Sequence, residues 1–207
     1  MAKILLISFL TFFLLFSCSK KKNEMAISEP SDEEKAIEIY SEAVDALKEG
    51  DAFYAGKKFR EVEILFPQGK WATKASLMAS YSDYSRSAYT NAIFNLERHI
   101  TNYPADENIS YAHYLIAMCY YEQILDEKKD LNPLLKAQEK FKYIMEVYPN
   151  TDYATDARFK LDLIIDQLAA KEMSIARFYM KTKKWIPALN RLKIVVEKYD
   201  KTVFIEE

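Results

Sequence analysis

Four stretches of this chain repeat the same landmarks in the same register, and this repetition constrains the fold more than any other feature. Each stretch carries a small alanine, and the four alanines are Ala55, Ala92, Ala137 and Ala188. A large apolar residue follows four positions later, at Phe59, Leu96, Phe141 and Leu192. Twelve positions after the alanine comes Pro67, Pro104 or Pro149, with Asp200 in the fourth copy. Independent helices would not agree at three positions at once, so the sequence predicts repeated copies of one structural unit.

The composition favours an all-helical chain with a substantial core. The 207 residues include 3 glycines and 6 prolines, while hydrophobic residues make up 50% and aromatic residues 14%. So few turn residues argue against a sheet. The formal net charge is −2, with 29 Lys and Arg against 31 Asp and Glu, and this balance gives no electrostatic basis for binding nucleic acid.

The clearest copy of the unit lies at 174–199. Two runs with the three- and four-residue spacing of amphipathic helices flank a polar segment at 181–184, and Trp185 opens the second run with Pro187 in its first turn. The second run is predicted to bury Ala188, Leu189, Leu192, Val195 and Val196. The two helices are expected to cross at Ala176 and Ala188, with Tyr179, Trp185 and Leu192 filling the space around them. This is the tetratricopeptide-repeat (TPR) pattern.

The sequence therefore predicts an all-α TPR superhelical solenoid of about four helix-turn-helix repeats plus the start of a fifth. The repeats are assigned to 31–67, 70–104, 109–149 and 152–200, and 201–207 would begin the fifth. The spacing between successive alanines widens along the chain. We place the extra residues in a loop at 126–133 and in an unusually long first helix that runs from Tyr153 to Met180.

The first thirty residues read as a targeting and anchoring segment. Residues 1–17 hold one early cation and an apolar run too short to span a bilayer, as in a secretory signal peptide. Leu15, Phe16, Ser17 and Cys18 resemble a bacterial lipobox, which implies cleavage before Cys18 and covalent lipid on that residue. The alternative is an ordinary export signal that happens to contain a cysteine. Residues 18–30 are predicted to be a flexible tether, and Ser31 with Glu34 forms a capping box that opens the folded domain.

No group of residues in the sequence suggests catalysis. The two histidines, His99 and His113, fall on different predicted helices, and neither is expected to bind a metal. Cys119 lies in an apolar helix and is expected to be a buried, unpaired thiol. We therefore predict a protein that is not an enzyme and has no cofactor besides the lipid on Cys18.

The first helices of the repeats are expected to line the inner groove of the solenoid. The residues predicted to face this groove are Tyr40, Val44, Leu47, Leu77, Tyr81, Tyr84, Tyr114, Met118 and Tyr121. Tyrosine offers rigid apolar area together with a hydroxyl, which suits an extended peptide rich in aromatic side chains. The alternative is that these tyrosines only fill the space between helices.

The chain as a whole resembles the BamD family of outer-membrane β-barrel assembly lipoproteins. The resemblance rests on the lipobox, the repeats ending in Phe-Pro or Tyr-Pro, the sequence Tyr-Pro-Asn-Thr-Asp-Tyr at 148–153, the long helix, and Ala-Lys-Glu-Met-Ser-Ile-Ala-Arg-Phe-Tyr at 170–179. It implies a scaffold anchored in the outer membrane by its lipid and facing the periplasm. It also implies that unfolded outer-membrane proteins are recognised by the N-terminal repeats, and that BamA and other subunits are bound by the C-terminal ones. Asn190 and Arg191 match the surface of the family that faces BamA, which makes Arg191 the candidate docking residue, against the alternative of an ordinary exposed arginine.

Two expectations remain open at this point. The family has five repeats, so we expect a truncated sequence in which residues 203–205 leave apolar surface uncovered after the fourth repeat. A lipoprotein TPR adaptor that coordinates peptidoglycan or other envelope enzymes is the alternative function.

Overall fold

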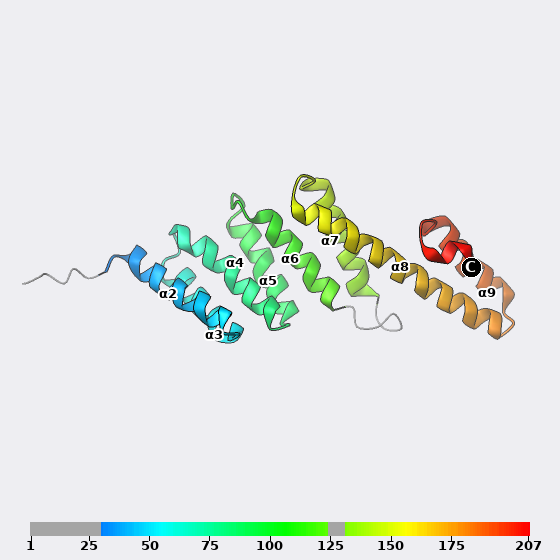
Figure 1. Ribbon diagram of the computed structural model, residues 1–207, viewed down its shortest axis with the longest axis horizontal. Coiled ribbons are helices and arrows are strands. Elements are labelled where there is room, and N and C mark those ends of the chain that lie inside the picture. The colour runs from blue at the N-terminus through cyan, green and yellow to red at the C-terminus, as the bar shows by residue number, and fades with distance from the viewer. Residues whose placement is uncertain (1–29, 124–130) are drawn as a thin grey trace, which may run out of the picture. The chain divides into compact units, whose positions relative to one another are not determined.

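The computed structural model describes residues 30–123 and 131–207, and all regular structure within them is helical (Figure 1). The helices are α2 (Asp32–Lys48), α3 (Ala52–Leu65), α4 (Lys70–Ser85), α5 (Tyr89–Asn102), α6 (Ile109–Glu122), α7 (Asn132–Val147), α8 (Asp152–Lys181), α9 (Trp185–Lys198) and the short 3₁₀ helix η1 (Val203–Glu206). The predicted all-α fold is confirmed. Four predicted features lie wholly or mostly outside the described residues: the signal peptide at 1–17, the lipidated Cys18, the tether up to residue 29, and the loop at 126–133.

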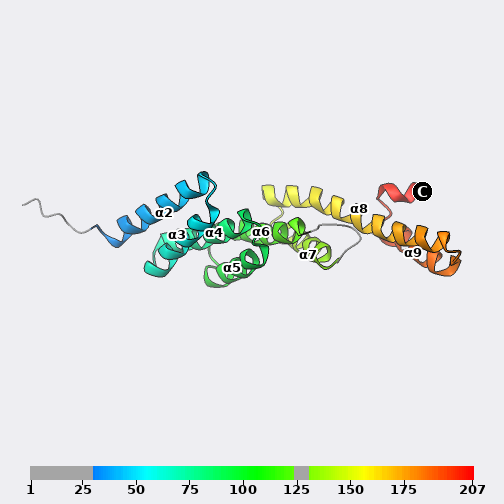
Figure 2. The same ribbon diagram turned by 90° about the horizontal axis from the view of Figure 1, so that it is seen from below.

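The helices form successive antiparallel pairs, each packed on the next (Figures 1 and 2). The first helices of the pairs, α2, α4, α6 and α8, also contact one another in succession. Between the second helices the described contacts run through side chains: Arg98 of α5 donates to both carboxylate oxygens of Glu63 of α3, at 3.0 and 2.8 Å. The first helices therefore form one continuous face, as in a solenoid whose units contact only their neighbours.

Local sequence signals set the helix ends. The predicted capping box opens α2: the Ser31 backbone N–H donates to Glu34 Oε2 at 2.7 Å, and the Glu34 N–H donates to Ser31 Oγ at 3.2 Å. Gly50, at φ 90°, makes the turn into α3, which Asp51 caps by accepting a bond from the Tyr54 N–H at 2.9 Å. At the start of α7, Pro133 lies inside the first turn, so this helix begins before the predicted end of the preceding loop.

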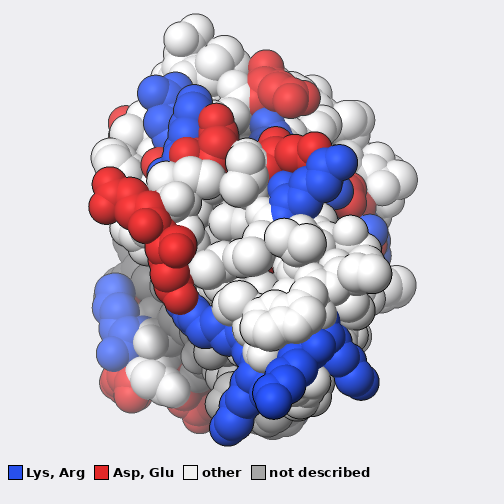
Figure 3. All heavy atoms as spheres, turned by 90° about the vertical axis from the view of Figure 1, so that its right-hand side faces the viewer, with Lys and Arg blue, Asp and Glu red and all other residues white. Residues whose placement is uncertain are grey.

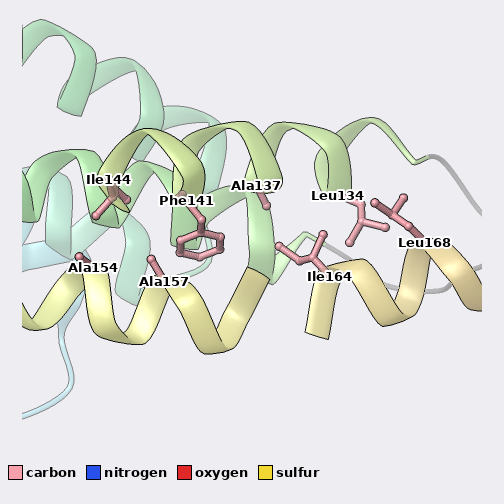
Figure 4. Packing of buried hydrophobic residues seen from close by; sticks show 9 residues of the cluster. Leu134, Ala137, Phe141, Ile144, Ala154, Ala157, Ile164 and Leu168 are labelled. Carbon is pink, nitrogen blue, oxygen red and sulfur yellow. The ribbon is translucent and has the colours of Figure 1, made fainter. Parts of the chain in front are cut away.

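The repeated landmarks coincide with the buried core. Ala55, Ala92 and Ala137 are fully buried, and so are their apolar partners Phe59, Leu96 and Phe141. Figure 4 shows the arrangement between α7 and α8, where Phe141 points toward the small Ala157 and Ile144 toward Ala154. In this pair a small residue on one helix makes room for a large one on the other. In the fourth copy Ala188 is buried with 2% exposure, whereas Leu192 is half-buried.

Helix α8 is 30 residues long, which confirms the predicted long helix. At 1.5 Å per residue it extends about 45 Å. Its part from 154 to 168 shares a core with α6 and α7 through Ala154, Ala157, Ile164 and Leu168. Its second half buries Ala169, Met173 and Ala176 and pairs with α9. One helix thus joins two packing units.

The prediction for α9 was partly wrong. Ala188 and Val195 are buried as expected, but Leu189 and Val196 are 64% and 60% exposed. Each of these two follows a buried residue by one position, which turns it about 100° away from α8. Trp185 is 60% exposed instead of filling the helix crossing, because it opens α9 at the end of the hairpin, where α8 has already ended at Lys181.

Candidate binding surface

The nine predicted groove residues lie on α2, α4 and α6, which belong to the continuous first-helix face. Eight of them are half-buried, and Leu77 is buried with 6% exposure. All nine belong to or pack against the hydrophobic clusters between helices. Their side chains therefore fill inter-helix space with one side and reach solvent with the other. Recognition of a peptide by this surface stays a prediction.

On α2, the Tyr40 ring packs against two other aromatic rings. Its centroid lies 5.1 Å from that of Phe59 and 5.0 Å from that of Trp71. Val44 and Leu47 continue this strip along the same cluster. Burial raises the pKa of Tyr40, so its phenol stays neutral and can both donate and accept hydrogen bonds.

On α4, Tyr81 and Tyr84 stack in a series that continues to Tyr89 of α5, with centroid distances of 6.2 and 5.9 Å. Burial, followed by the nearby Glu122 carboxylate, raises the pKa of Tyr84 to about 12. The phenol is therefore held neutral in a largely apolar site. This series forms the middle of the candidate surface.

On α6, Tyr114 is tied to α8. Its hydroxyl donates to Asp156 Oδ2 at 2.5 Å, and its ring lies 5.2 Å from the ring of Tyr153. Tyr121 packs at 6.0 Å from Phe141 and lies under the Lys160 ammonium at 5.0 Å. These contacts hold both rings against α7 and α8.

Sequence reasoning missed the contribution of α8 to this surface. Tyr153, Asp156 and Lys160 come from its first turns and contact the tyrosines of α6. These three residues are spaced three and four positions apart, which places them on one face of the helix. This spacing could have been recognised from the sequence. Tyr111, which lies 5.5 Å from Tyr153, was also missed.

A buried ionic cluster joins α3, α4 and α5. Asp83 is 1% exposed, and its carboxylate accepts bonds from Arg60 Nη2 at 2.5 Å, Arg86 Nη2 at 2.9 Å and Asn95 Nδ2 at 2.9 Å. A buried carboxylate with this many donors is fully compensated. The cluster therefore fixes the relative position of three helices behind the tyrosine surface.

The two histidines and Cys119 take part in packing and hydrogen bonding within the protein. His99 is fully buried, its Nε2 lies 3.0 Å from Asp106 Oδ2, and burial lowers its pKa, so the neutral ring donates this bond. His113 stacks on Tyr143 and Tyr148, with centroids at 4.9 and 5.7 Å. Cys119 is free and buried, as predicted, and burial raises the pKa of its thiol to about 12.

Arg191, the predicted docking residue, is half-buried and paired within the chain. Its Nη1 donates to both carboxylate oxygens of Glu172 on α8, at 3.0 and 3.3 Å. Guanidinium presents five N–H donors, and Nη1 alone takes part in this pair. Arg191 is thus held in place with Nε and Nη2 still able to meet an external acceptor.

The comparisons with known proteins define the class of this protein. Among the described residues, no helix combines the length and apolarity needed to cross a membrane. A family described as outer membrane lipoprotein (YfiO) matches residues 32–207, which include every described helix. The chain belongs to this family.

Relatives within the family carry a more particular name. The chain is 40% identical over 171 residues to the outer membrane protein assembly factor BamD of Caulobacter vibrioides, and the match covers 82% of this chain and 56% of the relative. It is 33% identical over 189 residues to BamD of Rickettsia prowazekii, covering 91% and 73%. It is 26% identical over 203 residues to BamD of Vibrio cholerae, covering 93% and 82%. The predicted resemblance to BamD is confirmed, and the family is one of assembly factors and not of enzymes, as the sequence predicted. The chain spans little more than half the length of the Caulobacter relative.

Proposed function

We propose that this chain is a lipid-anchored scaffold of the outer-membrane β-barrel assembly machinery, which recognises unfolded outer-membrane proteins and docks BamA. The observation that carries the proposal is the family match, because it spans 32–207 and relatives in that family are named outer membrane protein assembly factors. In this proposal the lipid on Cys18 holds the scaffold at the outer membrane, with its helices in the periplasm. Acyl labelling should be lost in a Cys18→Ala variant, which would then leave the membrane fraction.

The tyrosines of the first-helix face would receive the unfolded substrate. An extended segment of a barrel strand alternates apolar and polar side chains and exposes unpaired backbone groups. Half-buried rings offer apolar contact area, and neutral phenols offer hydrogen bonds to the exposed backbone. Tyr81, Tyr84 and Tyr114 combine both properties, since burial keeps them packed while one side of each reaches solvent.

A peptide that ends in a barrel signal tests this surface. We expect the combined Tyr81→Ala and Tyr114→Ala substitutions to weaken binding at least about tenfold, since removing buried aromatic contacts at an interface costs more than about 1 kcal/mol each. Tyr143→Ala is the matched control, because Tyr143 is 39% exposed on a second helix and lies off the proposed surface. Equal affinity of the double variant and the native chain, measured by fluorescence anisotropy, would exclude the surface.

Arg191 would bind a carboxylate of BamA through the donors that Glu172 leaves free. An arginine already oriented by an intramolecular pair loses less side-chain entropy on docking. We expect Arg191→Ala to reduce co-purification of BamA, whereas Lys193→Ala should not, because Lys193 is exposed and pairs with Glu197 on the same helix. Loss of BamA in both variants would point to the net charge of α9 and not to Arg191.

A further inference from the structure

The turn between α8 and α9 lies in a stretch whose charged residues are all basic. Residues 173–196 contain six lysines and arginines and no aspartate or glutamate, although the whole protein has a formal charge of −2. In Figure 3, which faces the α9 end of the molecule, Lys and Arg gather at the lower edge, next to a broad area without charged side chains. The α8–α9 turn lies at this lower edge in Figure 1.

Half of these cations are neutralised within the protein. Arg177 pairs with Glu207, Arg191 with Glu172, and Lys193 with Glu197. Lys181, Lys183 and Lys184 form no ion pair with any described residue, and all three are exposed. The uncompensated charge is therefore concentrated in one four-residue turn.

Large apolar side chains flank the same turn. Phe178 is 59% exposed, Trp185 is 60% exposed and Ile186 is 76% exposed. We call these three residues, together with Lys181, Lys183 and Lys184, the α8–α9 tip. Isolated exposed apolar residues are ordinary, but three beside three free lysines form an amphipathic surface.

The backbone of the α8–α9 tip is well fixed. The Lys184 N–H donates to the Tyr179 carbonyl at 2.9 Å, and the Thr182 N–H donates to the Phe178 carbonyl at 3.1 Å. Lys183 takes a left-handed conformation at φ 57°, which closes the turn. The lysines and Trp185 are thus presented together by a rigid corner.

We propose that the α8–α9 tip contacts the anionic headgroups of a phospholipid bilayer. Lysine ammonium groups act as hydrated point charges that are attracted to an anionic lipid surface, and tryptophan favours the boundary between headgroups and acyl chains. A projecting corner fits a flat surface better than it fits an extended peptide. The free cations are all lysines, whereas recognition of a protein carboxylate favours the fork of arginine, and both arginines of this segment are already paired.

This contact goes beyond the proposed assembly function, because it would position the α9 end against the membrane independently of the peptide surface. Several acyl chains on Cys18 would by themselves hold the chain at the membrane. The α8–α9 tip would add an orienting contact at the α9 end and would not be needed for attachment.

The emission of Trp185 tests the proposal in the full lipidated chain. The protein is reconstituted into vesicles of phosphatidylglycerol and phosphatidylethanolamine with brominated acyl chains, which quench fluorophores at short range. The other tryptophan, Trp71, is removed from the signal by subtracting the spectrum of a Trp185→Phe variant. We expect Trp185 to lose most of its emission in these vesicles, to keep it in brominated phosphatidylcholine vesicles, and to recover it as salt is raised. Unchanged Trp185 emission in the anionic brominated vesicles overturns the proposal.

Charge reversal at the α8–α9 tip gives the second test. The combined Lys181→Glu, Lys183→Glu and Lys184→Glu substitutions should abolish the quenching. Lys57→Glu, Lys136→Glu and Lys142→Glu form the matched control, with the same change in net charge at exposed positions on α3 and α7. If Trp185 emission in the charge-reversed variant is quenched as in the native chain, the bilayer is not the ligand. The same conclusion follows if the variant loses binding to an acidic protein while its quenching by lipid is unchanged. Peptide binding is measured in parallel, so a failure here is distinguishable from a failure of the assembly function.

Discussion

At the scale of single residues, Asp83 is a buried carboxylate with three side-chain partners. It lies in α4, and its donors Arg60 and Asn95 lie in α3 and α5. Removing one partner of a buried ion pair costs far more than the pair itself contributes, because the remaining charges lose their compensation. Asp83 therefore holds two cations and three helices at once.

We predict that Asp83→Ala lowers the free energy of unfolding by about 3 kcal/mol or more. Asp45→Ala is the matched control, because Asp45 pairs with Lys48 at 2.8 Å with both side chains more than 60% exposed. That exposed pair should contribute less than about 1 kcal/mol. Urea unfolding of both variants measures the difference, and similar losses in the two would contradict the buried role of Asp83.

A single residue, Tyr84, also makes the stability of the fold depend on pH. Burial raises the pKa of Tyr84 to about 12, while a tyrosine in an unfolded chain titrates near about 10. The folded state thus holds this proton more tightly than the unfolded state does. The corresponding stability is fully present below about pH 10 and is lost as the pH rises toward about 12.

We therefore expect the denaturation midpoint to fall as the pH is raised through this window, and to fall less in a Tyr84→Phe variant. Lysine deprotonation is common to both proteins and cancels in the comparison. Midpoints measured at about pH 9 and about pH 11 provide the test. An identical fall in the two proteins would show that Tyr84 does not contribute.

At the scale of elements, the α8–α9 pair depends on two small residues at the helix contact. Ala176 is fully buried and Ala188 is 2% exposed. Small residues let two helices approach closely, so added volume at either position must push the helices apart. Because each helix contacts only its neighbours, the damage should stay local.

We predict that Ala176→Leu destabilises the α8–α9 pair by about 1–3 kcal/mol and speeds amide hydrogen exchange in α9. Exchange in α2 to α5 should not change, since these helices make no contact with α9. Ser174→Leu on the exposed face of α8 is the control. Faster exchange throughout the molecule would mean that the solenoid unfolds as one unit instead of by neighbours.

The element scale also shows how far the sequence could lead. Helix pairs, the long α8 and the buried Ala55, Ala92 and Ala137 were predictable, because periodicity and register are local properties. The partners of Asp83 were not, since Arg60 and Asn95 are 23 and 12 residues away and no spacing rule links separate helices. The exposure of Leu189 escaped prediction for a similar reason. The apolar residues of a helix show which positions can be buried, but not how many neighbouring helices will cover them.

At the scale of the whole molecule, the solenoid separates its surfaces along the chain. The tyrosines lie on α2, α4 and α6, whereas Arg191 and the α8–α9 tip belong to the last helix pair. Long-range contact runs through neighbouring helices, so a ligand on one surface need not disturb the other. A scaffold that holds a substrate and a partner at the same time requires this separation.

Co-purification of the full lipidated chain from envelope extract tests the central claim most directly. We predict that BamA is recovered with the native protein and that recovery falls in the Arg191→Ala variant, while the Tyr81→Ala and Tyr114→Ala variant keeps BamA and loses unfolded outer-membrane proteins. Recovery of peptidoglycan enzymes without BamA would contradict the account and would assign the chain to the coordination of cell-wall synthesis or hydrolysis.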